Sequence, residues 1–183
     1  MPLKHRPPDT GPVITPGSVS MDLFNQPGHL LRRANQIAVG TFNDLVGPGI
    51  TSIQYAILRM VHEKPGIDQV GLARRIALDT STTALTAARL DAKGLITRKV
   101  ADSDRRQLQL TLTAEGEVLL SSLVSGVHRM REQLLDALDP AEQEVFMSLL
   151  QKFVHIKNDQ SRAPLRVPGS PVVPVRPRKP RAV

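Results

Sequence analysis

The feature that most constrains this chain is one change of hydrophobic period along its sequence. Apolar residues recur every three or four positions across residues 30–90, and the same helical spacing returns across residues 118–154. Between these blocks, residues 107–112 alternate polar and apolar side chains, which is the period of a half-buried strand. We therefore predict a mainly α-helical fold that contains one β-hairpin.

Glycine, proline and cap residues divide the helical blocks. Gly47-Pro48-Gly49 and Lys64-Pro65-Gly66 end two helices, and Gly94 is a natural C-cap glycine. Asp79-Thr80-Ser81 is a strong helix start, and Pro140 opens the last helix. The expected helices lie at about residues 27–46, 51–63, 69–77, 79–93, 114–138 and 140–154.

The composition excludes several classes of site. The chain contains no cysteine, so disulfides, thiolate chemistry and the common structural zinc sites are not expected. No apolar run approaches the ~20 residues of a membrane span, and residues 1–20 lack the apolar core of a secretion signal. We therefore expect a cytoplasmic protein with no membrane partner. Only 3% of the residues are aromatic, which argues against a single-strand-binding surface built on stacked rings.

The net charge of +7 lies mainly in one terminal segment. Residues 161–183 carry six basic side chains and no acidic one, and together with residues 1–21 they hold most of the prolines. Because a proline-rich segment of this kind cannot form a packed core, we predict that both terminal segments are disordered arms. Between them, residues 70–113 carry eight basic and four acidic side chains, a net +4 that suits a polyanion.

Three short helices followed by a basic hairpin are typical of a winged helix-turn-helix. A helix that enters the major groove of double-stranded DNA needs short polar side chains on one face, and residues 80–86 supply them. Residues 96–100 are the expected partner of the alternating strand, so the Arg105-Arg106 pair lies at the hairpin tip and can reach the minor groove. The predicted DNA-contacting residues are Thr80, Ser81, Thr82, Thr83, Thr86, Arg89, Arg74, Arg75, Arg98, Asp104, Arg105 and Arg106.

Simpler interpretations of the same residues stay open. One of the threonine or serine side chains at residues 80–83 caps its helix in any case. The Arg105-Arg106 pair is a solvated turn if it does not meet DNA. Arg89 either contacts a phosphate or pairs with a carboxylate such as Asp91 or Asp102.

The chain resembles the MarR family of transcriptional regulators in three segments: TSIQYAILRMV, QVGLARRIALDTSTTALTAARLDAKGLITR and DSDRRQLQLTLTAEG. The resemblance covers about residues 27–155 and is most specific at GLITR, the D-R-R wing and the LT-x-x-G helix start. It implies a homodimer that binds pseudo-palindromic operators and is often released by small phenolic or aromatic acids. By position, Arg106 is the wing arginine and Asp104 is its partner. Ala87 stands where some relatives carry an arginine, so base readout by that arginine is not available here.

The same resemblance implies the domain organisation. A MarR-type domain would span residues 22–160, with arms at residues 1–21 and 161–183 on either side. Its DNA-binding part would cover about residues 50–113, and its dimerisation helices about residues 26–46 and 114–158. The segment QPGHLLRRANQIA is similar to that of regulators near aromatic-acid and nicotinate degradation genes.

An effector site is predicted beside the first helix. His29, Arg33 and Gln36 are spaced by four and three residues, so they share one helix face. An arginine binds a carboxylate bidentately, and Tyr55 with its apolar neighbours would supply a wall for an aromatic ring. The alternative is an ordinary polar helix face or an intersubunit salt bridge.

No catalytic residue, cofactor or metal site is predicted. The sequence has no G-x-S-x-G, no H-E-x-x-H and no glycine-rich phosphate loop. Asp102-Ser103-Asp104 resembles the start of a calcium loop, but the required glycine is replaced by Gln107. The leading hypothesis is a repressor relieved by an aromatic acid. The alternatives are a ligand-independent, nucleoid-type DNA-binding protein and a structural protein with a proline-rich ligand arm.

Overall fold

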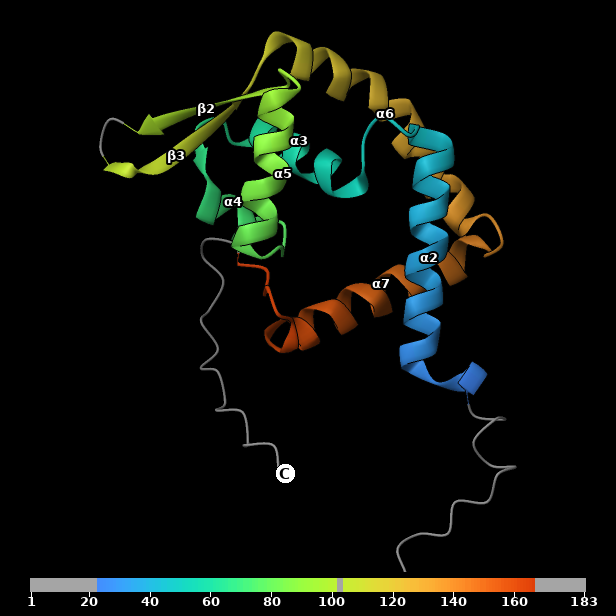
Figure 1. The fold of residues 1–183 in the computed structure, drawn as a ribbon. Helices are drawn as coiled ribbons and strands as arrows, with labels where there is room; N and C mark the ends of the chain where they lie inside the picture. The colour runs from blue at the N-terminus through green and yellow to red at the C-terminus, as the bar shows by residue number, and fades with distance from the viewer. Residues whose placement is uncertain (1–22, 102–103, 167–183) are drawn as a thin grey trace, which may run out of the picture. The chain divides into compact units, whose positions relative to one another are not determined.

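The structure is a computed structural model that describes residues 23–101 and 104–166, with the backbone alone at residues 101 and 104–106. The chain divides into two compact units, residues 1–40 and 41–183. The described elements, in chain order, are η1 (Leu23–Asn25), α2 (Pro27–Val46), α3 (Ser52–Glu63), β1 (Ile67–Asp68), α4 (Gln69–Arg75), α5 (Thr80–Ala92), β2 (Ile96–Ala101), β3 (Asp104–Leu112), α6 (Ala114–Leu135), α7 (Pro140–Lys157) and η2 (Asn158–Gln160). The predicted mainly α-helical fold with one hairpin is confirmed (Figure 1).

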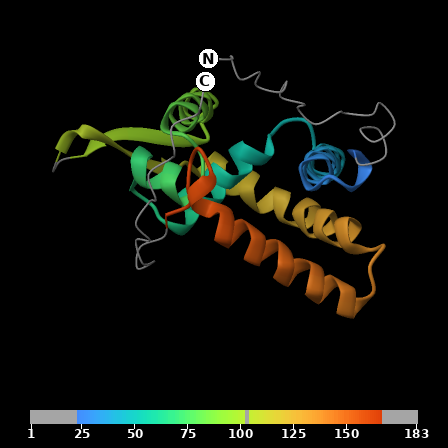
Figure 2. The same cartoon turned by 90° about the horizontal axis from the view of Figure 1, so that it is seen from below.

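The sheet is small and antiparallel. Its strand order is β1-β3-β2, and β2 pairs with β3 from Ile96 opposite Leu112 to Ala101 opposite Asp104. The two-residue strand β1, which the sequence pattern did not predict, pairs Ile67 with Leu110. In Figures 1 and 2 the β2–β3 hairpin projects away from the helices of the same unit, as a wing does.

The hydrophobic core of this unit forms where α3, α4, α5 and the sheet meet. Its fully buried members come from each of these elements, and they include Ile57, Leu58, Val61, Leu72, Ala87, Leu90, Ile96 and Leu110. Every apolar side chain removed from water here contributes about 25 cal/mol per Å² of buried surface. The core therefore fixes the faces that α4 and α5 turn inward and, by exclusion, those that they turn outward.

Side-chain caps begin the helices where the sequence predicts them. Thr51 accepts a hydrogen bond from the Gln54 backbone N–H, and the Gln54 side chain accepts one from the Thr51 N–H, which completes a capping box. Asp139 and Glu142 form the same box at α7. Each cap satisfies helix N–H groups that otherwise lack a partner, and is worth ~1 kcal/mol.

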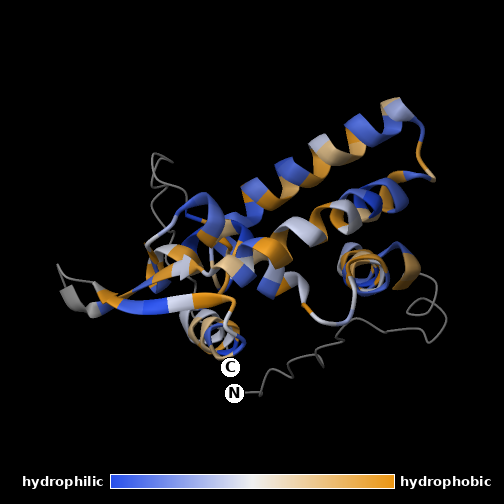
Figure 3. Cartoon of the chain, turned by 90° about the horizontal axis from the view of Figure 1, so that it is seen from above, coloured by the Kyte–Doolittle hydropathy of each residue, from blue (hydrophilic) through white to orange (hydrophobic). Residues whose placement is uncertain are grey.

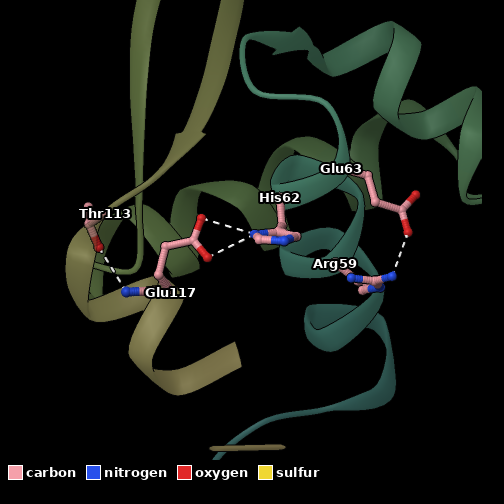
Figure 4. Close-up of polar contacts among 6 residues, drawn as sticks. Arg59, His62, Glu63, Thr113 and Glu117 are labelled. Carbon is pink, nitrogen blue, oxygen red and sulfur yellow. Dashed lines mark hydrogen bonds and ion pairs between the residues drawn. The ribbon is translucent and has the colours of Figure 1, made fainter. Parts of the chain in front are cut away.

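The start of α6 is held by hydrogen bonds to two of the residues between α5 and β2. The Thr113 hydroxyl donates to the Gly94 carbonyl at 2.6 Å, and the Thr113 N–H donates to the Leu95 carbonyl at 3.1 Å. One turn later, Glu117 Oε2 lies 2.8 Å from His62 Nδ1 of α3, beside the Arg59–Glu63 pair (Figure 4). Both partners of the histidine pair are about half exposed, so the pair adds little stability and the backbone contacts hold α6 in place.

The chain after α7 is bound to the fold further than expected. Residues 161–166 belong to the segment predicted as an arm, yet Leu165 and Arg166 form hydrogen bonds and Arg166 an ion pair. The pattern of prolines and arginines did not indicate this, because the bonds are made mainly by backbone groups. Residues 1–22 and 167–183 lie outside the described residues.

We predict that Gly116→Ala destabilises the protein. A Cβ at this position would overlap the Leu95 backbone carbonyl oxygen, so the start of α6 would have to shift. Overpacking of this kind costs about 1–3 kcal/mol. Thermal denaturation followed by circular dichroism measures the destabilisation. Gly28→Ala, which has open space around its Cβ, is the matched control and should leave the melting temperature nearly unchanged. Equal melting temperatures for the two variants would contradict the close approach.

Candidate DNA-binding site

Helices α4 and α5 form the two helices of the helix-turn-helix. The turn between them holds Ala77 at φ 53°, a left-handed conformation that costs a non-glycine residue roughly 1 kcal/mol. The N–H of Leu78 donates to the Ala73 carbonyl at 3.0 Å, which closes the end of α4 in this conformation. The sharp reversal positions the N-terminus of α5 at the molecular surface, where Thr80 and Ser81 are exposed.

Helix α5 has a buried face and an exposed face. Thr83, Ala87 and Leu90 have no exposed surface, and Thr86 is only 9% exposed. Ser81, Leu85 and Arg89 lie on the opposite side, at the four-residue spacing that places side chains on one face. Thr82 is partly exposed beside them. The outward face therefore offers one hydroxyl, one apolar side chain and one cation along two turns of helix.

Thr83 and Thr86 do not belong to the set of residues that can reach DNA bases. The Thr83 hydroxyl donates to the Asp79 carbonyl at 2.9 Å inside the fold. Both threonines were expected on the base-facing side because their side chains are short and polar. Both residues are instead buried on the core side of α5, where the hydroxyl of Thr83 is satisfied by its bond to the Asp79 carbonyl. We remove both residues from the proposed contacts.

Leu85 is the exposed residue that sequence reasoning missed. Its side chain is 54% exposed between Ser81 and Arg89, although it is the kind of residue that usually packs inward. In the major groove an apolar side chain can contact the methyl group of thymine. The helical spacing from Ser81 was the available signal, but the choice between the two faces of α5 required the position of the core.

Asp79 is the N-cap of α5. Its carboxylate accepts a hydrogen bond from the Thr82 N–H at 2.8 Å. Hydrogen bonds from the side chain and then the backbone of Thr82 hold the pKa of Asp79 below its ordinary value. A lowered pKa in the folded state means that this cap stabilises the fold at neutral pH and is lost as the pH falls through that lowered pKa. Helix α5 therefore keeps this charged cap at neutral pH.

The structure describes only some of the wing residues that were predicted to contact DNA. Strand β2 ends at Ala101 and β3 begins at Asp104, so Arg105 and Arg106 lie within β3 and not in the connection between the strands, where the sequence placed them. Residues 102–103 lie outside the described chain. The side chains of Asp104, Arg105 and Arg106 lie outside the description as well. Along the described part of β2, Lys99 is exposed and Thr97 shares a 2.6 Å hydrogen bond with Thr111.

Arg98 has an unusual position for a surface cation. Its Nε has no exposed surface and no hydrogen-bond partner among the described residues. The Arg98 Cα lies opposite Leu110, so the side-chain stem covers the edge of the core. In α4, Arg74 is exposed and Arg75 is partly exposed.

The residues of the predicted effector site lie in different units of the chain. His29, Arg33 and Gln36 are in residues 1–40, whereas Tyr55 is in residues 41–183, where its ring packs 6.1 Å from that of Phe42. Gln36 accepts a 2.8 Å hydrogen bond from Arg32, a partner that the predicted three-residue face did not include. His29 contacts Phe24 edge-to-face at 5.8 Å.

Two further observations limit the chemistry of the described residues. Among them, no three histidine, aspartate or glutamate side chains are grouped as a metal would require. Within the same residues, no helix is long and apolar enough to cross a lipid bilayer.

A helix-turn-helix that carries a β-hairpin wing and an exposed second helix defines the winged-helix class of DNA-binding proteins. Residues 50–108 match the model of the MarR family. The chain is 34% identical to the transcriptional regulator HosA of Escherichia coli O111:H- over 135 residues, which cover 74% of this chain and 99% of HosA.

Solved structures give the same result. The PcaV regulator of Streptomyces coelicolor, in complex with its natural ligand, superposes with a TM-score of 0.70 at 36% identity, over 73% of this chain and 95% of PcaV. Bordetella bronchiseptica BpsR, whose DNA binding is regulated by 6-hydroxynicotinic acid, has a TM-score of 0.65 at 29% identity, over 69% and 96% of the two chains. The chain belongs to the MarR family and is a DNA-binding transcriptional regulator. These relatives are regulators rather than enzymes.

We predict that substitutions on the two faces of α5 separate stability from DNA binding. Thr83→Val removes a buried hydrogen bond and should lower the unfolding free energy by about 1 kcal/mol, with little effect on DNA affinity well below the melting temperature. Leu85→Ala should leave the melting temperature nearly unchanged. It should weaken binding to a duplex selected by the wild-type chain from a random pool by about 1 kcal/mol, roughly fivefold in Kd. Denaturation measures the stability of each variant, and gel-shift titration measures its DNA affinity. A Thr83→Val variant that loses DNA affinity, with a Leu85→Ala variant that loses only stability, would contradict the outward face that we describe.

Proposed function

We propose that this regulator is a homodimeric repressor of pseudo-palindromic operators and that a small aromatic acid relieves repression. The observation that carries the dimer is the exposed apolar face of α7. The effector is supported by the chemistry of the first helix and by the relatives PcaV and BpsR. The wing residues Asp104, Arg105 and Arg106, with Arg74, Arg75 and Arg98, are proposed to hold the DNA backbone and minor groove.

The apolar face of α7 requires a partner. None of the 18 residues of α7 is buried in the single chain, although the helix carries a series of large apolar side chains. Figure 3 shows hydrophobic and hydrophilic residues recurring along this C-terminal helix. Its exposed apolar side chains are Val145, Phe146, Leu149, Leu150, Phe153, Val154 and Ile156. An apolar surface of this extent on a soluble chain marks a protein interface, and a second copy would bury it.

A symmetric dimer fits the expected operator. Two recognition helices related by a two-fold axis bind two half-sites, with centres about one helical turn, ~10 bp, apart. The palindrome then follows from the symmetry of the protein rather than from any additional contact.

We predict that Leu149→Asp dissociates the dimer. Leu149 is 59% exposed in the single chain, so the change has little effect on the fold of one protomer, but it would bury an unpaired charge in the interface. Gln151→Asp introduces the same charge two positions further along the helix and is the matched control. Sedimentation equilibrium measures the mass. A dimer that persists in Leu149→Asp at micromolar concentration would argue against α7 as the interface.

The first helix offers suitable chemistry for an aromatic acid. Arg33 is exposed and its side chain forms no hydrogen bond or ion pair with any described residue, whereas the side chain of its neighbour Arg32 is bonded to Gln36. His29 Nε2 has no exposed surface and no hydrogen-bond partner among the described residues. A buried polar atom without a partner is costly, so a hydroxyl or carboxylate of a ligand would satisfy it. We therefore propose that Arg33 binds the carboxylate and that His29 and Gln36 bind polar groups of the ring.

A ligand relieves repression only if it binds the DNA-incompetent form better than the competent one. We predict that Arg33→Ala abolishes release of DNA by 6-hydroxynicotinic or another hydroxylated aromatic acid, because the carboxylate loses its bidentate partner. DNA affinity without ligand should stay within about threefold, since this helix is outside the helix-turn-helix.

Arg129→Ala is the control, since it removes an exposed arginine of α6 that is outside the proposed ligand contacts and should keep the response. Both measurements belong on one preparation, by fluorescence anisotropy with labelled DNA. If the aromatic acid releases DNA from Arg33→Ala as it does from wild type, Arg33 does not bind the ligand and is an ordinary surface residue.

A further inference from the structure

The segment that follows α7 is fastened by a set of contacts that we call the tail clip, residues 158–166. The Asn158 side chain bonds the Leu165 backbone twice: its Nδ2 donates to the Leu165 carbonyl at 3.0 Å, and its Oδ1 accepts from the Leu165 N–H at 2.7 Å. Arg166 forms a 3.1 Å ion pair with Asp159. One amide side chain thus closes a loop of seven residues onto the end of α7.

The tail clip ends on the helix-turn-helix itself. The Arg166 N–H donates to the Arg74 carbonyl at 2.7 Å, in the last turn of α4. At the end of α5 the corresponding carbonyl, that of Asp91, accepts from the cap glycine Gly94 at 2.8 Å. The tail therefore completes the C-terminal cap of α4 in the place where a residue of the following turn completes that of α5. In Figures 1 and 2 the red segment after α7 reaches the chain between α4 and α5.

This position lies at the DNA-facing end of the domain. Arg74 precedes the α4–α5 turn, and the first residues of α5, which follow that turn, are the ones that a helix-turn-helix directs at base edges. The chain that continues from Arg166 carries Arg176, Arg178, Lys179 and Arg181 and no acidic residue. The ten residues from Arg166 to Arg176 span at most ~33 Å, about the length of one turn of duplex.

We propose that the tail clip directs this basic segment to the DNA phosphates that flank each half-site. The proposal rests on the DNA-binding function of the family and goes beyond it, because the clip couples the end of α7 to the helix-turn-helix and sets where the cations act. Phosphate contacts add affinity without sequence information. The basic segment therefore raises affinity for the flanks and leaves operator choice to α5 and the wing.

The first test measures the salt dependence of binding to a duplex that wild-type protein selects from a random pool, with 15 bp of flank on each side. In one variant Arg176, Arg178, Lys179 and Arg181 are all changed to glutamine. The slope of log K against log salt should fall by about 0.9 for each phosphate that the segment no longer neutralises, and hence by at least about two for a dimer. The selected sequence should not change. An unchanged slope would overturn the proposal. The four cations would then serve to bind a protein partner or to keep the protein soluble.

The second test asks whether the tail clip sets the position of the segment. Because the chain has no cysteine, Ser170→Cys provides a single thiol for an iron chelate that cleaves nearby DNA. When the clip residues are unchanged, the DNA should be cleaved only within a few base pairs beside each half-site. The double variant Asn158→Ala with Arg166→Pro removes the two bonds to Leu165, the Arg166–Asp159 ion pair and the N–H that binds the Arg74 carbonyl. The chain is then free from Lys157, so the tether to Arg176 lengthens from ten to nineteen residues. The local concentration of the segment should then fall about 2.6-fold, and cleavage should spread over more than one helical turn.

Gln160→Ala, on the same turn and outside the clip contacts, is the matched control and should keep the confined pattern. An identical pattern in the double variant and wild type would overturn the role of the clip even if the salt slope responds. Failure of the wild-type chain to select any DNA sequence would contradict the regulator function itself, and the proposal with it. The two kinds of failure are therefore distinguishable.

Discussion

The arrangement of the DNA-binding unit depends on the burial of one face of α5. Thr83, Ala87 and Leu90 pack without exposed surface in the core formed with α3 and the sheet. A helix fixed in this way cannot rotate by one residue without moving a polar or charged side chain inward. The burial therefore decides which side chains of α5 meet water, and through them which ones can meet DNA.

Contacts at both ends of α5 fix the positions of the neighbouring turn and of α6. At its N-terminus, Asp79 caps the helix directly after the strained turn at Ala77. At its C-terminus, the Gly94 and Leu95 carbonyls accept hydrogen bonds from Thr113. The Leu95 carbonyl also lies so close to α6 that only glycine fits at residue 116. A displacement of α6 would therefore move the residues that follow the C-terminus of α5. This is the physical connection that a regulator needs if a ligand bound near the dimerisation helices is to change the spacing of two recognition helices.

Local chemistry accounts for what the sequence predicted well. The change of period at residues 107–112 located the wing, and Thr51, Asp79, Gly94 and Pro140 marked helix ends, because caps and turns act within a few residues. The faces of α5 were less accessible to sequence reasoning. A run of threonine and serine suits both a groove-facing surface and a hydrogen-bonded core, and the position of α3 decides between them for Thr83 and Thr86. The contact of Arg166 with α4 left no signature at all, since it is made by two backbone groups.

The central claim is that the face of α5 that carries Ser81 and Leu85 contacts the operator. Because the natural chain contains no cysteine, Ser81→Cys and Leu85→Cys each introduce one reactive thiol, and Ser122→Cys introduces one on α6 as a reference. The rate of alkylation of each thiol is measured with and without the selected duplex. The account predicts that DNA slows alkylation at positions 81 and 85 at least about tenfold and leaves position 122 unchanged, since a base-contacting face is excluded from solvent in the complex. Equal rates with and without DNA at positions 81 and 85, under conditions where the duplex is fully bound, would contradict it.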